Sequence, residues 1–120
     1  MTSQDSALTR MLACIRKRPT MYLTQPTISC LRAFLDGWQL AREELGSEHD
    51  GTLARFQAWL EKRFDLRPGP NTSWDSIIRF MSANEVEALD VAFELFATFE
   101  EKKGDPAFAP DETGIETGGG

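Results

Sequence analysis

The sequence is poor in histidine and cysteine, on which many enzyme active sites and metal sites depend. Among its 120 residues it has one histidine and two cysteines. His49 would have to serve any Ser–His–Asp or Cys–His arrangement, and Cys14 and Cys30 are too few for a disulfide framework or a well-supported metal site. Neither a P-loop nor a G-x-G-x-x-G segment is present. We therefore expect no enzyme activity, no cofactor and no metal site.

Long apolar runs and a basic excess are also lacking. No apolar run approaches the roughly 18 residues that span a bilayer, and the N-terminus lacks the apolar stretch of a signal peptide. Thirteen Lys and Arg residues oppose 19 Asp and Glu residues, which gives a net charge of −6. This balance argues against general binding to nucleic acid or anionic membranes, because both require a surplus of cations. We expect a cytoplasmic protein with reduced thiols.

The apolar residues that are present recur at helical spacing along almost the whole chain. The predicted helices are a first one ending before Pro19, a second from Thr27 or Ser29 to Gly46, a third from Asp50 or Thr52 to Phe64, a short fourth around Trp74 to Met81, and a fifth beginning near Ser82. The sequence thus predicts an all-α, compact single-domain bundle of about five helices over residues 1–103. A flexible acidic tail is predicted over residues 104–120.

The last predicted helix has the clearest pattern. Ser82-Ala83-Asn84-Glu85 fits a capping box, in which Ser82 accepts a hydrogen bond from the third helical N–H and Glu85 reaches back. A buried stripe is predicted to follow, formed by Val86, Leu89, Phe93, Phe96 and Phe99.

The acidic excess lies in the last third of the chain, where residues 84–120 hold two bases and ten acids, a net charge of −8. At about 100° per residue, four carboxylates of the last helix fall within an arc of roughly 60°, away from the phenylalanines. These are Glu87, Asp90, Glu94 and Glu101. No lysine along the arc compensates them, so we expect them to point into water together. A solvated surface and a di-metal site are the alternatives to a docking surface for a basic partner protein.

A second feature is the segment R-K-R-P-T-M-Y-L from Arg16 to Leu23. It is predicted to end a helix and to tuck Met21, Tyr22 and Leu23 into a packed corner. The segment resembles the R-K-R-P-G-M-Y-I-G stretch of the gyrase B subunit and its ATPase relatives. Thr20 stands at that family's glycine, and the asparagine-bearing helix and glycine-rich lid have no counterpart, so ATP binding is not expected.

A broader resemblance covers most of residues 8–100. Its motifs are R-P-x-M-Y-L at 18–23, L-x-x-F-L-x-G-W at 31–38, F-x-x-W-L at 56–60, S-W-x-x-I-I at 73–78 and E-x-x-A-L-D-x-x-F-E-L-F at 85–96. This order resembles a family of small, mostly uncharacterised bacterial proteins that includes candidate immunity proteins of polymorphic or contact-delivered toxins. The resemblance implies a protein that binds and neutralises a cognate toxin, and it supplies no catalytic residues.

Two other functions stay open at this point. One is a regulatory or interaction module without a toxin partner, such as a homodimer that packs through Trp59 or Trp74. The other is a small-ligand-binding protein or enzyme, in which Arg18, Tyr22 and a gap beside Gly37 would form the site. Acid–base chemistry by paired carboxylates belongs to this second class, because pairing in space is invisible in a sequence.

Overall fold

The computed structural model of the chain describes residues 6–47, 51–67 and 73–102. Over these ranges the protein is all-α, as predicted, and has no strand. The helices are α1 (Ala7–Lys17), α2 (Pro19–Tyr22), α3 (Ile28–Glu44), α4 (Thr52–Arg63), α5 (Trp74–Phe80) and α6 (Glu85–Lys102). The predicted tail over 104–120, the loop over 68–72 and His49 lie outside the described residues.

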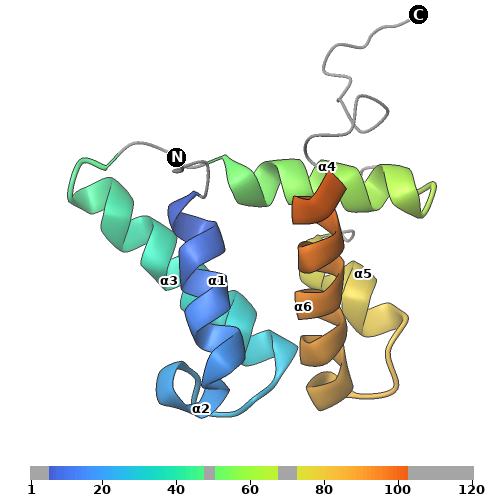
Figure 1. Cartoon of the computed structure of the whole chain (residues 1–120), viewed down its shortest axis with the longest axis horizontal. Coiled ribbons are helices and arrows are strands. Elements are labelled where there is room, and N and C mark those ends of the chain that lie inside the picture. Colours follow the sequence, from blue (N-terminus) through green and yellow to red (C-terminus); the bar gives the residue numbers. More distant parts are fainter. Residues whose placement is uncertain (1–5, 48–50, 68–72, 103–120) are drawn as a thin grey trace, which may run out of the picture.

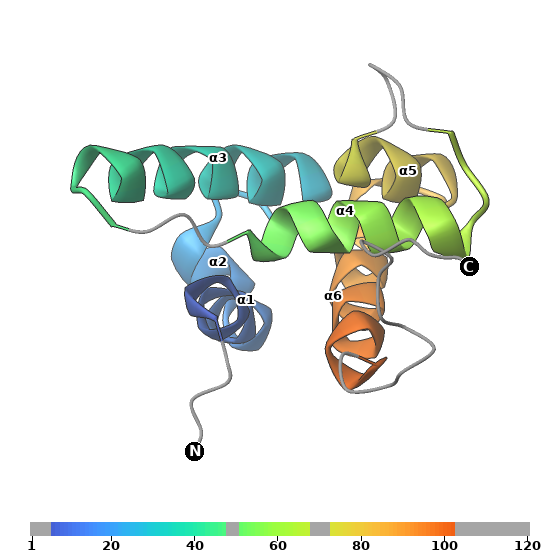
Figure 2. The same ribbon diagram turned by 90° about the horizontal axis from the view of Figure 1, so that it is seen from above.

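The helices form a front and a back layer joined by α4. Figure 1 shows α1 and α6 in front, side by side and running in opposite directions, with α4 crossing at one end of both. Figure 2 shows α3 and α5 on the other side of α4, behind α1 and α6. None of the helices within the described ranges is long and apolar enough to cross a membrane.

The core is built around the ring of Phe56 on α4. This ring lies 5.2 Å from the ring of Phe96 and 5.5 Å from that of Phe99, both on α6. It also contacts Trp74 of α5 at 6.4 Å and Trp59 of its own helix at 6.0 Å. Such aromatic pairs are worth about 0.5–1.5 kcal/mol each beyond the area they bury. Phe56 therefore holds α4, α5 and α6 together.

Helix ends explain why the first half of the chain folds as it does. Ser6 caps α1 by accepting a hydrogen bond from the N–H of Thr9 at 3.0 Å, and Thr27 caps α3 through the N–H of Cys30 at 3.2 Å. Pro19 ends α1, as predicted, and then occupies the first position of α2, where its missing N–H costs nothing. The chain therefore turns sharply between the front and back layers.

The α6 capping box was predicted two residues too early. Asn84 is the cap, because its side-chain oxygen accepts from the N–H of Glu87 at 2.8 Å, and the Glu87 carboxylate reaches back to the N–H of Ala83 at 3.4 Å. Ser82 instead donates to the carbonyl oxygen of Ile78 at the end of α5, at 2.7 Å. Asn is as good an N-cap as Ser, so once α5 has engaged Ser82 the next cap in the sequence is used.

Some apolar residues that were predicted to be buried lie on the surface. Leu23 is buried, but Met21 is 66% exposed and Tyr22 is also exposed, so the predicted packed corner is only partly correct. Val86 is 51% exposed, whereas the other members of the predicted α6 stripe are buried. Val86 stands in the first turn of α6, beyond the reach of the neighbouring core.

Gly37 and Trp74 also differ from the expectation. A Cβ added at Gly37 would meet nothing within 4 Å, and the residue is exposed, so neither a neighbouring helix nor an enclosed gap lies beside it. Trp74, which the alternative homodimer would use as an exposed contact in place of Trp59, is buried against Phe56.

Two helix ends provide a matched test of backbone strain. Gly46 follows α3 with φ of +80° and Asp65 follows α4 with φ of 55°, and each ends its helix in a Schellman motif. We expect Asp65→Gly to raise the free energy of unfolding by about 0.5–1 kcal/mol, because a side chain is strained at positive φ. Gly46→Ala should lower it by a similar amount. Urea unfolding curves measure both, and a destabilised Asp65→Gly variant would contradict this account.

Candidate functional site: the acidic face of α6

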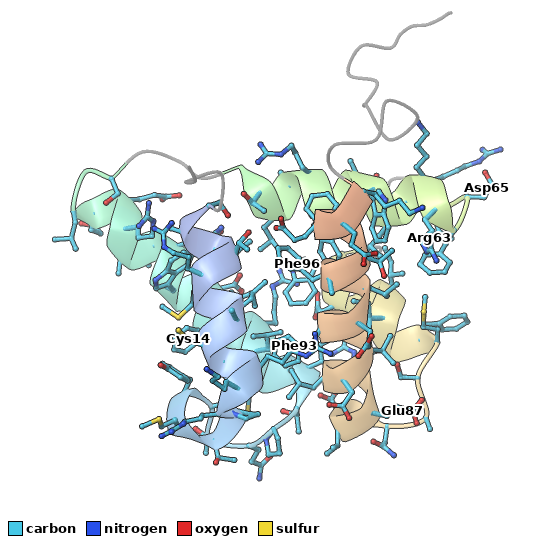
Figure 3. The ribbon with its side chains drawn as sticks, in the orientation of Figure 1. Cys14, Arg63, Asp65, Glu87, Phe93 and Phe96 are labelled. Carbon is cyan, nitrogen blue, oxygen red and sulfur yellow. The ribbon has the colours of Figure 1, made fainter. Side chains whose placement is uncertain are left out.

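The four carboxylates singled out in the sequence share one side of α6. Glu87, Asp90, Glu94 and Glu101, which we call the acidic face, are all exposed. The opposite side of the helix is buried and consists of Ala88, Leu89, Ala92, Phe93, Phe96 and Phe99. Figure 3 shows Phe93 and Phe96 pointing from α6 into the space between α6 and α1. Anchoring by these rings orients the carboxylates toward water.

Glu94 is paired with a cation, although the sequence of α6 alone predicted that no counter-charge lies near it. The Arg16 guanidinium of α1 lies 2.6 Å from the Glu94 carboxylate and also 5.9 Å from the centre of the Phe93 ring. Both charged groups are largely exposed, so the ion pair contributes at most about 1 kcal/mol. Glu94 thus joins α6 to α1 as well as belonging to the acidic face.

Glu87 also has a role within the fold. Its carboxylate accepts from the N–H of Ala83, and its own N–H is bound by Asn84. A negative charge in the first turn is favoured by the helix dipole, which supports α6 by about 0.3–1 kcal/mol. The carboxylate is nevertheless exposed and keeps its charge toward solvent.

Asp90 and Glu101 take part in no such contact within the fold. Across residues 6–47, 51–67 and 73–102 no ion pair or hydrogen bond is found for either carboxylate. They stand eleven residues apart, which is about 16 Å along a helix at 1.5 Å per residue. These two side chains are therefore the carboxylates of the acidic face that no described cation neutralises.

Exposed apolar side chains lie at the turn between α5 and α6, where the acidic face begins. Phe80, the last residue of α5, is 93% exposed, and Met81 and Val86 are exposed as well. An exposed apolar cluster next to charged groups is typical of protein interfaces, in which an apolar centre is surrounded by a polar rim.

A second charged cluster, which the sequence did not reveal, joins α3, α5 and α6. Asp75 is buried, and its carboxylate accepts hydrogen bonds from the Arg32 guanidinium and, at 2.7 Å, from the Ser73 hydroxyl. Arg79 lies 3.7 Å from the same carboxylate. Burial lowers the pKa of Arg32, but the charges of Asp75 and Asp36 outweigh it, so the pKa lies above its ordinary value. Arg32 is therefore charged at every physiological pH.

The same cluster continues to the N-terminus of α6. Glu85 accepts from both the N–H and the hydroxyl of Ser29 on α3, at 3.0 and 2.9 Å, and Arg79 lies 3.8 Å from it. Because the Asp75 carboxylate is already engaged by several donors, we interpret the cluster as a connection between helices. The sequence signal for it was an acid directly after Trp74 in a short, largely apolar helix.

The alternative small-ligand site receives no support from its proposed residues. Arg18 is exposed, and the Tyr22 ring packs edge-on against Phe34 at 6.2 Å. A cavity of about 10 Å³ lies elsewhere, among apolar side chains that include Leu12, Phe56 and Phe93. This volume holds no more than about one water molecule. Within the described residues, no group of three His, Cys, Asp or Glu side chains could hold a metal ion.

No protein-family model matches the chain, and comparisons with curated proteins and with solved structures find no match either.

The buried cluster can be tested with two matched variants on Arg32. Asp75→Asn removes a buried charge and leaves two arginines without their shared partner, so we expect the free energy of unfolding to fall by about 1–3 kcal/mol. Asp36→Asn removes the solvent-exposed partner of the same Arg32 and should cost no more than about 0.5 kcal/mol. Urea unfolding at neutral pH gives both values. Equal losses in the two variants would refute a special role for Asp75.

Proposed function

We propose that this protein binds a basic partner protein through the acidic face of α6, and that it acts as an immunity protein that neutralises a cognate bacterial toxin. The observation that carries the proposal is the exposure of Asp90 and Glu101, unneutralised by any described side chain, on a helix anchored by three buried phenylalanines. A pre-organised charged surface of this kind loses little conformational entropy when it binds.

Charge complementarity explains how such a surface would act on a toxin. A toxin that acts on nucleic acids or nucleotides needs cations in its active-site cleft to hold phosphate groups. An acidic helix can occupy that cleft as a phosphate mimic. Complementary charge accelerates the encounter of the two proteins, and contacts in the apolar centre of the interface slow their dissociation. Phe80, Met81 and Val86 offer such an apolar centre beside the carboxylates.

The immunity role rests on the resemblance of the five sequence motifs to candidate immunity proteins, together with the small size of the chain and its single histidine. Binding alone neutralises a toxin when it covers the active site or prevents the substrate from entering. No chemistry by the inhibitor is needed, which agrees with a candidate site that consists only of exposed carboxylates and apolar side chains.

The structure determines which carboxylates are suitable for a test. Reversal of Glu94 would also break the ion pair with Arg16, and reversal of Glu87 would disturb the helix cap. Asp90→Lys combined with Glu101→Lys changes only the outer surface. The matched control is Glu43→Lys with Glu44→Lys, which makes the same charge change at exposed positions near the end of α3.

We expect the Asp90→Lys/Glu101→Lys variant to bind the toxin about 10- to 100-fold more slowly and to lose most of the salt dependence of association. The probes are the C-terminal domains of secreted proteins encoded beside the gene for this chain. Stopped-flow association and protection of cells that produce the toxin domain are the measurements. The control variant should bind and protect normally. An acidic-face variant with unchanged association and salt dependence would refute the proposal.

A further inference from the structure

The front layer of the molecule divides into a basic half and an acidic half. Residues 6–26, which contain α1 and α2, hold four bases and no acid, a net charge of +4. Residues 85–102, which form α6, hold six acids and one base, a net charge of −5. Because α1 and α6 lie side by side (Figure 1), the two opposite charges are presented on the same side of the molecule.

Two side-chain contacts fix how α1 and α6 are aligned. The Thr9 hydroxyl donates to the Glu100 carboxylate at 2.6 Å, and Arg16 is paired with Glu94 at 2.6 Å. Since the helices run in opposite directions, later residues of α1 lie level with earlier residues of α6. Lys17 is therefore level with the turn that contains Asp90 and Glu94. Arg10 is level with the turn that contains Glu101, and Ala13 lies level with Ala97 between them.

The solvent-facing residues of the two helices match in spacing as well as in charge. α1 buries Leu8, Leu12 and Ile15, which leaves Arg10, Ala13 and Lys17 on its exposed side. On α6 the corresponding exposed residues are Glu101, Ala97 and Glu94. In each set the charged residues are seven positions apart, about 10.5 Å along the helix, with an alanine between them.

We propose that this front layer binds a second copy of the chain, with a two-fold axis parallel to α1 and α6. Rotation about that axis leaves the height of every residue along the helices unchanged and exchanges the positions of α1 and α6. α1 of each copy therefore faces α6 of the other. Lys17 then meets Asp90 and Glu94 of the second copy, and Ala13 meets its Ala97. An axis perpendicular to the helices within the interface would place α1 on α1 and α6 on α6, which like charges oppose.

The dimer goes beyond the function proposed above and does not depend on it. Its contacts cover the acidic face, so a basic partner and the second copy exclude one another. Most of the interface groups are charged, and only two symmetry-related Ala13–Ala97 pairs lie at its centre. We therefore expect a reversible dimer that weakens steeply as added salt screens the charges.

The first measurement is sedimentation of the full chain across a concentration series. We expect dimers at about 20 mM salt and monomers at about 500 mM, where the Debye length is only about 4 Å and charge pairs at the surface are strongly screened. A chain that is monomeric at low salt throughout the concentration series would overturn the proposal.

Charge exchange then tests the pairing itself. Lys17→Glu and Asp90→Lys should each weaken the dimer at least about tenfold, because every dimer contains the altered contact twice. The double variant should restore dimerisation, since the two exchanged charges again attract across the interface. Matched controls are Arg67→Glu and Glu44→Lys, which make the same charge changes outside the front layer. Circular dichroism confirms that each variant is folded. A double variant weaker than both single ones, or controls with equal losses, would refute the alignment.

Lys17→Glu also separates this inference from the proposed function. It removes the cation needed for the dimer and leaves the acidic face intact, so binding of a basic toxin should be unchanged or stronger. A monomeric Lys17→Glu variant that still neutralises toxin supports both ideas. If the unaltered chain is monomeric and the Asp90→Lys/Glu101→Lys variant still loses toxin binding, the dimer is refuted and the proposed function stands.

Discussion

The packing of Phe56 against the phenylalanines of α6 is the constraint on which the rest of the structure depends. One ring from α4 contacts Phe96 and Phe99, and Trp74 of α5 closes the cluster. These contacts fix the rotation of α6 about its own axis. Because side chains on a helix are separated by about 100° each, fixing the buried side also fixes the direction of the exposed one. The acidic face is thus a consequence of where the aromatic rings are buried.

Electrostatic contacts hold α6 at its N-terminus and at one point along its length. At its N-terminus, Glu85 is held by Ser29 and Arg79, and the same Arg79 lies beside the buried carboxylate of Asp75. Along its length, Arg16 reaches Glu94 from α1. The first group joins three helices and includes the buried Asp75 carboxylate, whereas the second is a single exposed ion pair. Charges therefore help to orient α6 at its start and leave its outer surface available for a partner.

Much of the fold was predictable because its helix boundaries depend on local chemistry. Pro19 cannot continue α1, and Gly46 adopts a positive φ that few other residues tolerate, so each boundary can be read from a short stretch of sequence. The start of α6 was misplaced since Ser82 and Asn84 are both good caps. The hydrogen bond from Ser82 to Ile78 decides between them, and it exists only because α5 ends beside that turn.

The sequence by itself determined that the chain is helical, where most helices begin and end, and that Glu87, Asp90, Glu94 and Glu101 share one side of the last helix. The helical spacing of apolar and charged residues contains this information, because these properties belong to one helix at a time. Only the tertiary structure decided that Glu94 is paired with Arg16, 78 positions earlier in the chain, and that Asp75 joins α3 to α5. It also placed the basic α1 next to the acidic α6. These contacts depend on which helix lies beside which, and that arrangement results from side-chain packing that helical periodicity does not describe.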